Sequence, residues 1–347
     1  MLVFEPGSGK FNWYQIQEVT ITQGEVELYP GNVHLEALGL SQETDRIAYV
    51  LPHGGGQFAH PATFITAETL TEVERSLPFW PEQNRITLEL MRDGLERFPK
   101  LPQLLLSETA FFAHLPAWAG AYALPTELHS QGLRRYGGDS FTHQWAWQNT
   151  SSELPAPRRL VSIHLCDHPN LAAIAGGQAV ETSLGFTPVE GLPSLTSSGD
   201  VDPEIVLLLN RQGMPADKIY DLLVHQSGWQ TIAGPGRLVD LVEKDELVYQ
   251  MLRAGILKAF GAAAAALGGV DGLVFTCEER PRWLPFIRSI CEGLSFTNLT
   301  LLEQPDDSHQ GNMWVLNNAQ SAFKALALEA SYGRILFDLF AGIKVKD

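Results

Sequence analysis

The hydrophobic and polar positions follow two different periods along the chain, and together they predict a mixed α/β protein. Apolar residues recur at helical spacing in the stretches 84–98, 216–226, 236–267 and 281–294. Short apolar runs that end in polar or glycine-rich residues are typical of strands, and they occur at 2–16, 25–29, 46–56, 101–112, 158–165, 171–177, 271–276 and 313–318. The first run contains a tight turn at Gly7-Ser8-Gly9 and is expected to form two strands.

Three other stretches carry weaker patterns. Residues 321–340 form one long apolar stretch, which predicts a closing helix. The piece QWAWQ at 144–148 alternates apolar and polar residues, which indicates a strand. The run from Ala254 to Val270 contains Lys258 and is too short and too weakly apolar to span a bilayer, so it is expected to be a buried helix.

The composition changes near residue 115, where small, aromatic and loop residues fill 115–138 before a second α/β pattern begins. This change predicts two α/β halves with a terminal helix. The expected domains are residues 1–112 plus 320–347, and residues 113–319.

Composition narrows the possible partners and the compartment. Hydrophobic residues make up 45% of the 347 positions, which indicates a globular chain with a sizeable core. The formal net charge of -16 disfavours nucleic acid and anionic membrane surfaces as partners. Three cysteines without metal or redox spacing indicate a reducing compartment, and the first residues lack the features of a signal peptide. The cytoplasm is the expected location.

A series of motifs follows in order along the chain. They are VFEPGSG (3–9), HGG (53–55), ETAF (108–111), QGLRRYGGDS (131–140), HLCDH (164–168), TSLGFTPVEGL with SGDVDP (182–203) and FTCEERPR (275–282). In content and order they resemble the acetate kinase family, within the superfamily of sugar kinases, Hsp70 and actin. The part before His53 is shorter than this resemblance leads one to expect.

The resemblance implies a two-domain acetate kinase-like fold, related to actin-like ATPases and ribonuclease H, with a cleft between the domains. It also implies transfer of the γ-phosphoryl group of Mg-ATP to a carboxylate, and a homodimer formed through the second domain. Cations and positioned donors stabilise the negative charge of such a transition state.

Several positions depart from the pattern of that family. Val50 and Ser197 stand where the resemblance implies arginines, and Asp139 stands where it implies a histidine. Glu108 replaces an aspartate and Glu5 replaces an asparagine. Near the C-terminus, Asn318-Ala319-Gln320 stands where a metal-supporting glutamate is expected.

The nucleotide motifs are altered as well. A glycine-rich phosphate loop becomes Cys166-Asp167-His168, which adds a carboxylate and bulk. A second glycine-rich loop becomes CEERPR, in which Glu278 and Glu279 are expected to repel phosphate and Pro281 to remove a donor.

These motif positions define the candidate site residues. The catalytic candidates are Glu108, Asp139 and Asp200. The substrate-binding candidates are His53, Gly54, Val50, Arg134, Arg135 and Ser197. The nucleotide-binding candidates are Glu5, Ser8, Asp167, His168, Glu278 and Glu279.

Some of these residues allow alternatives. Asp200 could hold Mg²⁺ or form an Asx turn. Arg134 and Arg135 could grip an anion or form a salt bridge between domains. The histidines His53, His143, His164 and His168 could form a metal cluster with nearby aspartates, but satisfied structural histidines are favoured, and no metal site is expected.

The leading functional hypothesis is a family member whose ATP:carboxylate phosphotransfer is lost or severely impaired. The reason is that each lost oxyanion donor slows catalysis about 100- to 1000-fold. Such a protein would act as a binding or scaffold subunit, with a partner docked on the apolar segment 321–340. One alternative is an active, divergent carboxylate kinase in which Glu108, Asp139 and Asp200 carry metal or acid/base roles. Another is a weak acyl kinase that uses Arg134 or Arg135 as substitute cations. Mg-ATP is the expected cofactor only if activity remains.

Overall fold

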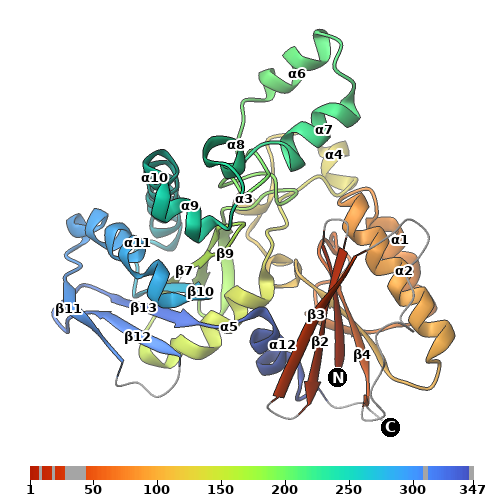
Figure 1. Cartoon of the computed structure of the whole chain (residues 1–347), viewed down its shortest axis with the longest axis horizontal. Helices are drawn as coiled ribbons and strands as arrows, with labels where there is room; N and C mark the ends of the chain where they lie inside the picture. Colours follow the sequence, from red (N-terminus) through yellow and green to blue (C-terminus); the bar gives the residue numbers. More distant parts are fainter. Residues whose placement is uncertain (8–9, 18–19, 28–43, 308–311, 344–347) are drawn as a thin grey trace. The chain divides into compact units, whose positions relative to one another are not determined.

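The computed structural model describes residues 1–7, 10–17, 20–27, 44–307 and 312–343, and it divides into two compact units (Figure 1). Unit 1 comprises Met1–His114, Ala123–Trp145 and Ser331–Asp347. Unit 2 comprises Leu115–Tyr122 and Ala146–Ala330. The expected domains put residues 123–145 in the second domain and residues 320–330 in the first, whereas the two units divide these stretches the other way. The chain crosses between the units more often than its composition indicates.

The described part of unit 1 contains a six-stranded sheet in the order β3-β2-β1-β4-β6-β5. Its strands are β1 (Leu2–Pro6), β2 (Lys10–Gln17), β3 (Thr20–Glu27), β4 (Ile47–Leu51), β5 (Ala62–Phe64) and β6 (Gln103–Ser107). The adjacent strands β1, β4 and β6 run parallel, whereas β2, β3 and β5 pair antiparallel with their neighbours. The parallel strands are the most buried because α2 packs against β1 and β4.

The helices of unit 1 follow from clear sequence signals. Thr66 caps the amino end of α1, and Pro81 occupies the first turn of α2, where a missing N–H is tolerated. The bounds are α1 (Ala67–Ser76), α2 (Pro81–Arg97), the 3₁₀ turn η2 (Ala110–Phe112), α4 (Thr126–Ser130), α5 (Ser140–Thr150) and α12 (Tyr332–Phe340). Helix α5 begins in unit 1 and ends in unit 2, and α12 packs against β2 and β3.

The described part of unit 2 contains a seven-stranded sheet in the order β11-β12-β13-β10-β7-β8-β9. Its strands are β7 (Arg159–Leu165), β8 (Asn170–Ala175), β9 (Gln178–Thr182), β10 (Gly272–Cys277), β11 (Leu301–Asp306), β12 (Met313–Asn317) and β13 (Lys324–Glu329). Strands β7, β10 and β13 run parallel, and β7-β8-β9 forms an antiparallel meander like β1-β2-β3. The two units therefore repeat one strand arrangement, and the predicted two-part α/β fold is confirmed.

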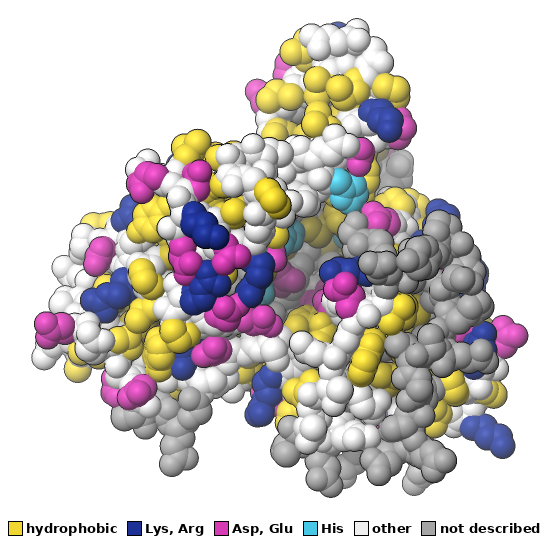
Figure 2. Space-filling view, in the orientation of Figure 1, with side chains coloured by type: hydrophobic (Ala, Val, Ile, Leu, Met, Phe, Trp, Pro, Cys, Tyr) yellow, Lys and Arg dark blue, Asp and Glu magenta, His cyan; other side chains and the backbone are white. Residues whose placement is uncertain are grey.

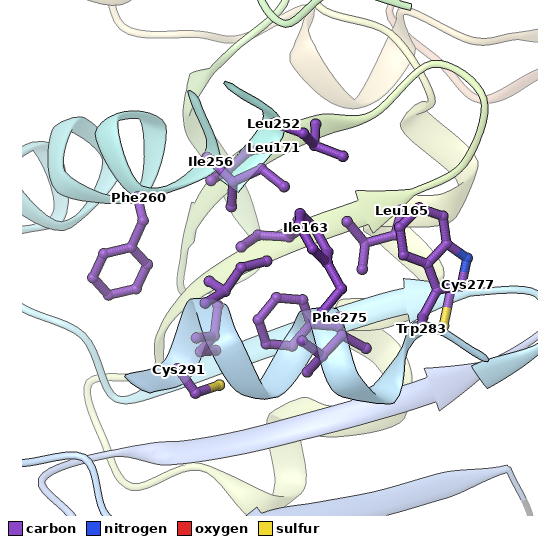
Figure 3. Close-up of a cluster of buried hydrophobic side chains, with 14 of the residues drawn as sticks. Ile163, Leu165, Leu171, Leu252, Ile256, Phe260, Phe275, Cys277, Trp283 and Cys291 are labelled. Atoms are coloured by element: carbon purple, nitrogen blue, oxygen red, sulfur yellow. The ribbon is translucent and has the colours of Figure 1, made fainter. Parts of the chain in front are cut away.

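Helices cover the sheet of unit 2 and enclose its core. Figure 3 shows part of this core, in which Phe275 of β10, Ile163 of β7 and Ile256 of α10 lie close together. The bounds are α3 (Ala117–Gly120), η3 (Ser151–Glu153), α6 (Pro203–Arg211), α7 (Ala216–His225), α8 (Trp229–Ala233), α9 (Leu238–Lys244), α10 (Glu246–Leu267), α11 (Arg280–Gly293) and η4 (Ser295–Thr297).

Three secondary-structure predictions are wrong or incomplete. Residues 321–340 form strand β13 and then α12, because a strand buried on both faces shows the same continuous apolar run as a buried helix. The piece QWAWQ lies inside α5, where Trp145 is buried. Within the run that begins at Ala254, helix α10 buries Ile256, Phe260 and Ala263 but exposes Lys258 and Ala262, so it buries one face only. Among the described residues, no helix is long and apolar enough to cross a membrane.

Alanine is expected to have opposite effects on stability at two glycines that lie inside helices. A Cβ at Gly94 in α2 would lie 1.8 Å from Tyr49 Oη, which donates a hydrogen bond to Gln103. A Cβ at Gly261 in α10 would meet nothing within 4 Å. We expect Gly94→Ala to lower the free energy of unfolding by about 1–3 kcal/mol because of overpacking. We expect Gly261→Ala to raise it by about 0.5–1 kcal/mol, since alanine is the better helix former. Urea denaturation of both variants checks this, and equal effects would contradict the packing around Tyr49.

Candidate functional site

The carboxyl ends of the three parallel strands of unit 1 lie at one edge of its sheet. Glu5 lies near the end of β1, His53 follows β4 and Glu108 follows β6. Side chains from these three ends therefore meet, which is where open α/β sheets bind ligands.

Glu108 is the central residue at this edge and is only 7% exposed. One of its carboxylate oxygens accepts a hydrogen bond from the Phe141 N–H at 3.3 Å, in the first turn of α5. The other accepts a hydrogen bond from the hydroxyl of Tyr332, the first residue of α12. The Glu108 carbonyl accepts from the Ser140 N–H at 3.2 Å. The single side chain thus ties the end of β6 to the amino ends of two helices.

The carboxylates of Glu5 and Asp139 interact electrostatically with Glu108. Glu5 accepts hydrogen bonds from the Tyr14 hydroxyl at 2.7 Å and from the Asn12 amide at 3.0 Å. Asp139 immediately precedes α5 and has a positive φ of 50°. Glu5, Glu108 and Asp139, with Tyr332, are called the acidic cluster below.

Burial changes the protonation of the acidic cluster. It raises the pKa of Glu108 to about 8, and the negative charges of Asp139 and Glu5 act in the same direction, while the hydrogen bonds from Tyr332 and Phe141 oppose them. Burial also raises the pKa of Glu5, and the charge of Asp139 adds to this. The pKa of Tyr332 lies well above its usual range because the hydroxyl is buried and faces Glu108. Glu108 therefore retains its proton at neutral pH.

The substrate-binding candidates of unit 1 have structural contacts. Val50 is 1% exposed within β4. His53 is also 1% exposed, and its backbone is held by Asn84 while its ring packs edge-on against Tyr136 at 4.8 Å. A Cβ at Gly54 would lie 2.4 Å from Ser107 Oγ, so glycine is required there by close packing.

Arg134, in the RRYG motif, contacts Arg135 and Tyr136 of the same loop. The Arg134 guanidinium lies 5.5 Å from the centre of the Tyr136 ring, and its Nε donates to the Arg135 carbonyl at 3.3 Å. Both side chains are half-buried. These contacts favour neither of the two roles considered for them.

Asp200 and Ser197 lie in the loop 183–202, which belongs to unit 2, whereas the acidic cluster belongs to unit 1. The Asp200 carboxylate accepts the Gly191 N–H at 2.8 Å, and the Asp200 N–H donates to the Gly191 carbonyl at 2.9 Å. Ser197 donates from its hydroxyl to Ser194 Oγ at 2.8 Å. Both residues thus brace the loop.

The loop after β7 is also fixed by its own polar side chains. Asp167 accepts the Leu238 N–H at 2.8 Å at the start of α9. A ring nitrogen of His168 lies 2.8 Å from the Pro188 carbonyl oxygen. A ring nitrogen of His164 lies 3.2 Å from the Thr276 carbonyl, so the histidine pair is structurally engaged.

Glu279, which is expected from the sequence to repel phosphate, is paired with two arginines in the structure. Glu279 pairs with Arg237 and also with Arg282, at 3.3 Å. Arg282 additionally contacts Asp240 at 2.7 Å and Glu243 at 2.6 Å. These five residues are called the arginine network below. Arg237 lowers the pKa of Glu279, and Arg282 lowers it further. Pro281 lies in the first turn of α11, where a missing donor has little effect.

The polar groups described at the strand ends of unit 2 are largely paired with one another. Both arginines of the network are already held by carboxylates, and Asp167 takes the backbone N–H at the start of α9. Asp167 and Glu278 are exposed and add negative charge to the loops that follow β7 and β10. Ser8 lies outside the described residues.

Sequence reasoning missed two residues of these clusters, Tyr332 of the acidic cluster and Arg237 of the arginine network. Asn318 lies in the turn before β13, and its side chain accepts the Gln320 N–H at 3.1 Å, so this stretch is a turn of unit 2. The residue near the C-terminus that joins the acidic cluster is Tyr332, which follows the N-cap Ser331. Recognising that cap would have placed Tyr332 at a helix start. Arg237 carried no such signal, because it pairs with Glu279 across 42 positions.

Comparison with known proteins establishes the family. The model of the acetokinase family matches residues 30–332, so the chain belongs to this family. It is 33% identical over 264 residues to the acetate kinase of Cyanothece sp., a match that covers 73% of this chain and 64% of that protein. It is 30% identical over 319 residues to the acetate kinase of Thermosynechococcus vestitus, covering 88% of this chain and 74% of that one.

Solved structures show the same fold. The acetate kinase of Porphyromonas gingivalis superimposes with a TM-score of 0.82 at 24% identity, covering 97% of each chain. The propionate kinase of Francisella tularensis gives a TM-score of 0.83 at 21% identity, covering 96% of this chain and 97% of that one. The predicted acetate kinase-like fold is thereby confirmed.

The raised pKa of Glu108 predicts a specific pH dependence of stability. Its stabilising proton is fully present below the ordinary pKa of 4.5 and is lost as the pH rises through about 8. We expect the free energy of unfolding in urea to fall over this range. Glu108→Gln should flatten the fall and be the more stable protein at about pH 9. Glu127→Gln on the exposed face of α4 serves as a control, and an unchanged profile in Glu108→Gln would contradict the assignment.

Proposed function

We propose that this acetokinase-family protein has lost, or nearly lost, ATP:carboxylate phosphotransfer and acts as a binding subunit. The observation that carries the proposal is the acidic cluster at the carboxyl ends of β1, β4 and β6. Three carboxyl groups lie there, and the neighbouring position on β4 is the buried Val50. An anionic acceptor and a γ-phosphate both need cations at such a place.

The polar groups of unit 2 support the same proposal. The arginine network neutralises its own two guanidinium groups, and Asp167 and Glu278 add exposed negative charge. A phosphate would have to displace existing ion pairs to gain contact with Arg237 or Arg282. Its binding is therefore opposed on the nucleotide side as well as on the acceptor side.

An active, divergent carboxylate kinase is the second candidate. The observation that favours it is the pKa of Glu108, about 8, because a group that titrates near the working pH suits proton exchange with a substrate. The curated relatives carry the name acetate kinase, which is consistent with this candidate.

Nucleotide binding distinguishes the two candidates. We expect isothermal titration calorimetry with MgATP and MgADP to show no heat of binding at millimolar nucleotide. A thermal shift assay should likewise leave the melting temperature unchanged, since a ligand that binds the folded state raises it by mass action. Acyl phosphate formation from acetate, trapped with hydroxylamine, should stay at the level of a protein-free blank.

Clear binding together with acyl phosphate formation would establish the second candidate. Asp139→Ala and Glu108→Gln would then be the informative variants, because an acid/base role in the acidic cluster requires them to reduce turnover. Binding without turnover would contradict the nucleotide part of the proposal alone.

We further propose a homodimer that forms through unit 2. Helix α6 has no buried residue, although its Ile205, Leu207 and Leu208 are 47%, 52% and 46% exposed. Adjacent apolar side chains of this size on one exposed helix are typical of a protein interface. A second copy of the chain is the occupant that the family resemblance implies.

The double variant Ile205→Glu/Leu208→Glu tests this interface. We expect the native protein to elute as a dimer and the variant as a monomer in size-exclusion chromatography with light scattering, because two buried charges disfavour an apolar interface. Asn210→Glu adds a charge to the same helix at a polar position and should leave the dimer intact. A monomeric native protein, or a dimeric double variant, would contradict the proposal.

A further inference from the structure

A cavity of about 440 Å³ opens among α9, α10 and α11 of unit 2, apart from the acidic cluster of unit 1. Its volume is in the range of sites that hold small organic molecules. The lining residues are Val239, Val242, Glu243, Lys244, Asp245, Glu246, Tyr249, Arg282, Trp283, Pro285 and Phe286.

Aromatic and aliphatic side chains form one part of this lining. Tyr249 and Phe286 meet edge to face, with ring centres 5.2 Å apart and planes at 79°. The Trp283 ring centre lies 5.8 Å from that of Phe286. Trp283 and Phe286 are anchored in the core, whereas Tyr249 is half-buried and keeps part of its ring accessible. Tyr249 is therefore the accessible ring of this aromatic wall, and Phe286 and Trp283 support it from the core.

Charged side chains form the other part, and their balance is negative. Glu243, Asp245 and Glu246 line the cavity together with Lys244 and Arg282. The charge of Arg282 is offset by Asp240, Glu243 and Glu279, which all contact its guanidinium. Figure 2 shows acidic and basic side chains lying side by side over the region of α9 and α11.

Two of the carboxylates keep capacity for a ligand. Asp245 accepts the Val248 N–H at 2.9 Å as the N-cap of α10, and Glu246 accepts the Gln250 amide at 2.6 Å. Each of these contacts uses one acceptor position of a group that has about four, and neither neutralises the charge. Both carboxylates thus keep acceptor positions at the cavity, beside Lys244 and the positive amino end of α10.

We propose that this cavity binds a compact organic cation that carries a ring, such as a benzylammonium ion. The ring packs against Tyr249, which Phe286 supports edge to face, and the ammonium group lies near Glu246 and Asp245. Aromatic faces and carboxylates both attract a cation, and the aromatic contribution is larger where water is partly excluded. An anion of the same shape is repelled. The proposal is independent of whether phosphotransfer is retained.

Benzyltrimethylammonium and benzoate are matched probes for this test, since they share a ring and differ in charge. We expect ligand-observed saturation-transfer NMR at about 150 mM salt, where long-range attraction is screened, to show binding of the cation and none of benzoate. Equal binding of both probes, or binding of neither, would overturn the proposal.

Four single variants locate the binding site. We expect Glu246→Gln to raise the dissociation constant about threefold, since one exposed charge is removed. Tyr249→Leu should raise the dissociation constant by a similar factor through loss of the aromatic face. Lys244→Gln should strengthen binding about twofold because it removes a like charge, and impaired folding cannot produce such a gain. Glu292→Gln removes an exposed carboxylate of α11 outside the cavity and should leave binding unchanged.

These variants also separate the site from general attraction to an acidic protein. If Glu292→Gln and Glu246→Gln change the affinity equally, the cation is held only by the overall charge and the proposal is wrong. If Tyr249→Leu binds as well as the native chain while remaining folded by circular dichroism, the aromatic wall is not part of the site and the proposal is equally wrong.

Discussion

Each unit is organised by three adjacent parallel strands that are buried and mostly apolar. The strands β1, β4 and β6, and the strands β7, β10 and β13, carry few polar side chains in their middle, and Glu5, His164 and Glu329 lie at or near a strand end. Polar chemistry is consequently concentrated at the ends of these strands and in the loops that follow them. Glu108 in unit 1 and Asp167 in unit 2 both occupy such positions, and each is bonded to the amino end of a helix.

The difference in burial explains why the acidic cluster and the arginine network differ in charge state. Glu108 is enclosed by its strand end and two helices, so burial dominates and favours its neutral form. Glu279 and Arg282 are accessible to solvent, so ion pairs dominate and both stay charged. The acidic cluster therefore holds a protonated Glu108, and the side chains of the arginine network neutralise one another through ion pairs. Neither arrangement presents the uncompensated positive charge that phosphoryl transfer needs.

Much of the fold was predictable from the sequence, because ordered motifs and strand-end positions do not depend on distant contacts. Glu108 and Asp139 were identified together from their motifs, but the third predicted member was Asp200 of unit 2 and not Glu5. The place of Asp139 at the start of α5 was not predicted, because part of that helix resembles a strand in sequence. Tyr332 was not predictable in this way, since β13 and α12 together look like one apolar helix. The pairing of Arg237 with Glu279 joins two loops 42 residues apart and leaves no periodic signal. Charges that appear repulsive in sequence can therefore be neutralised by partners that only the folded chain brings near.

The most direct test of this account is the protonation of Glu108 itself. Carbon-13 NMR of the glutamate carboxyl groups, recorded across a pH titration and assigned by comparison with Glu108→Gln, reports this group alone. The account predicts a midpoint at about 8, with the carboxyl neutral at pH 7. A midpoint near the ordinary value of 4.5 would show that Glu108 is ionised at neutral pH and would contradict the description of the acidic cluster.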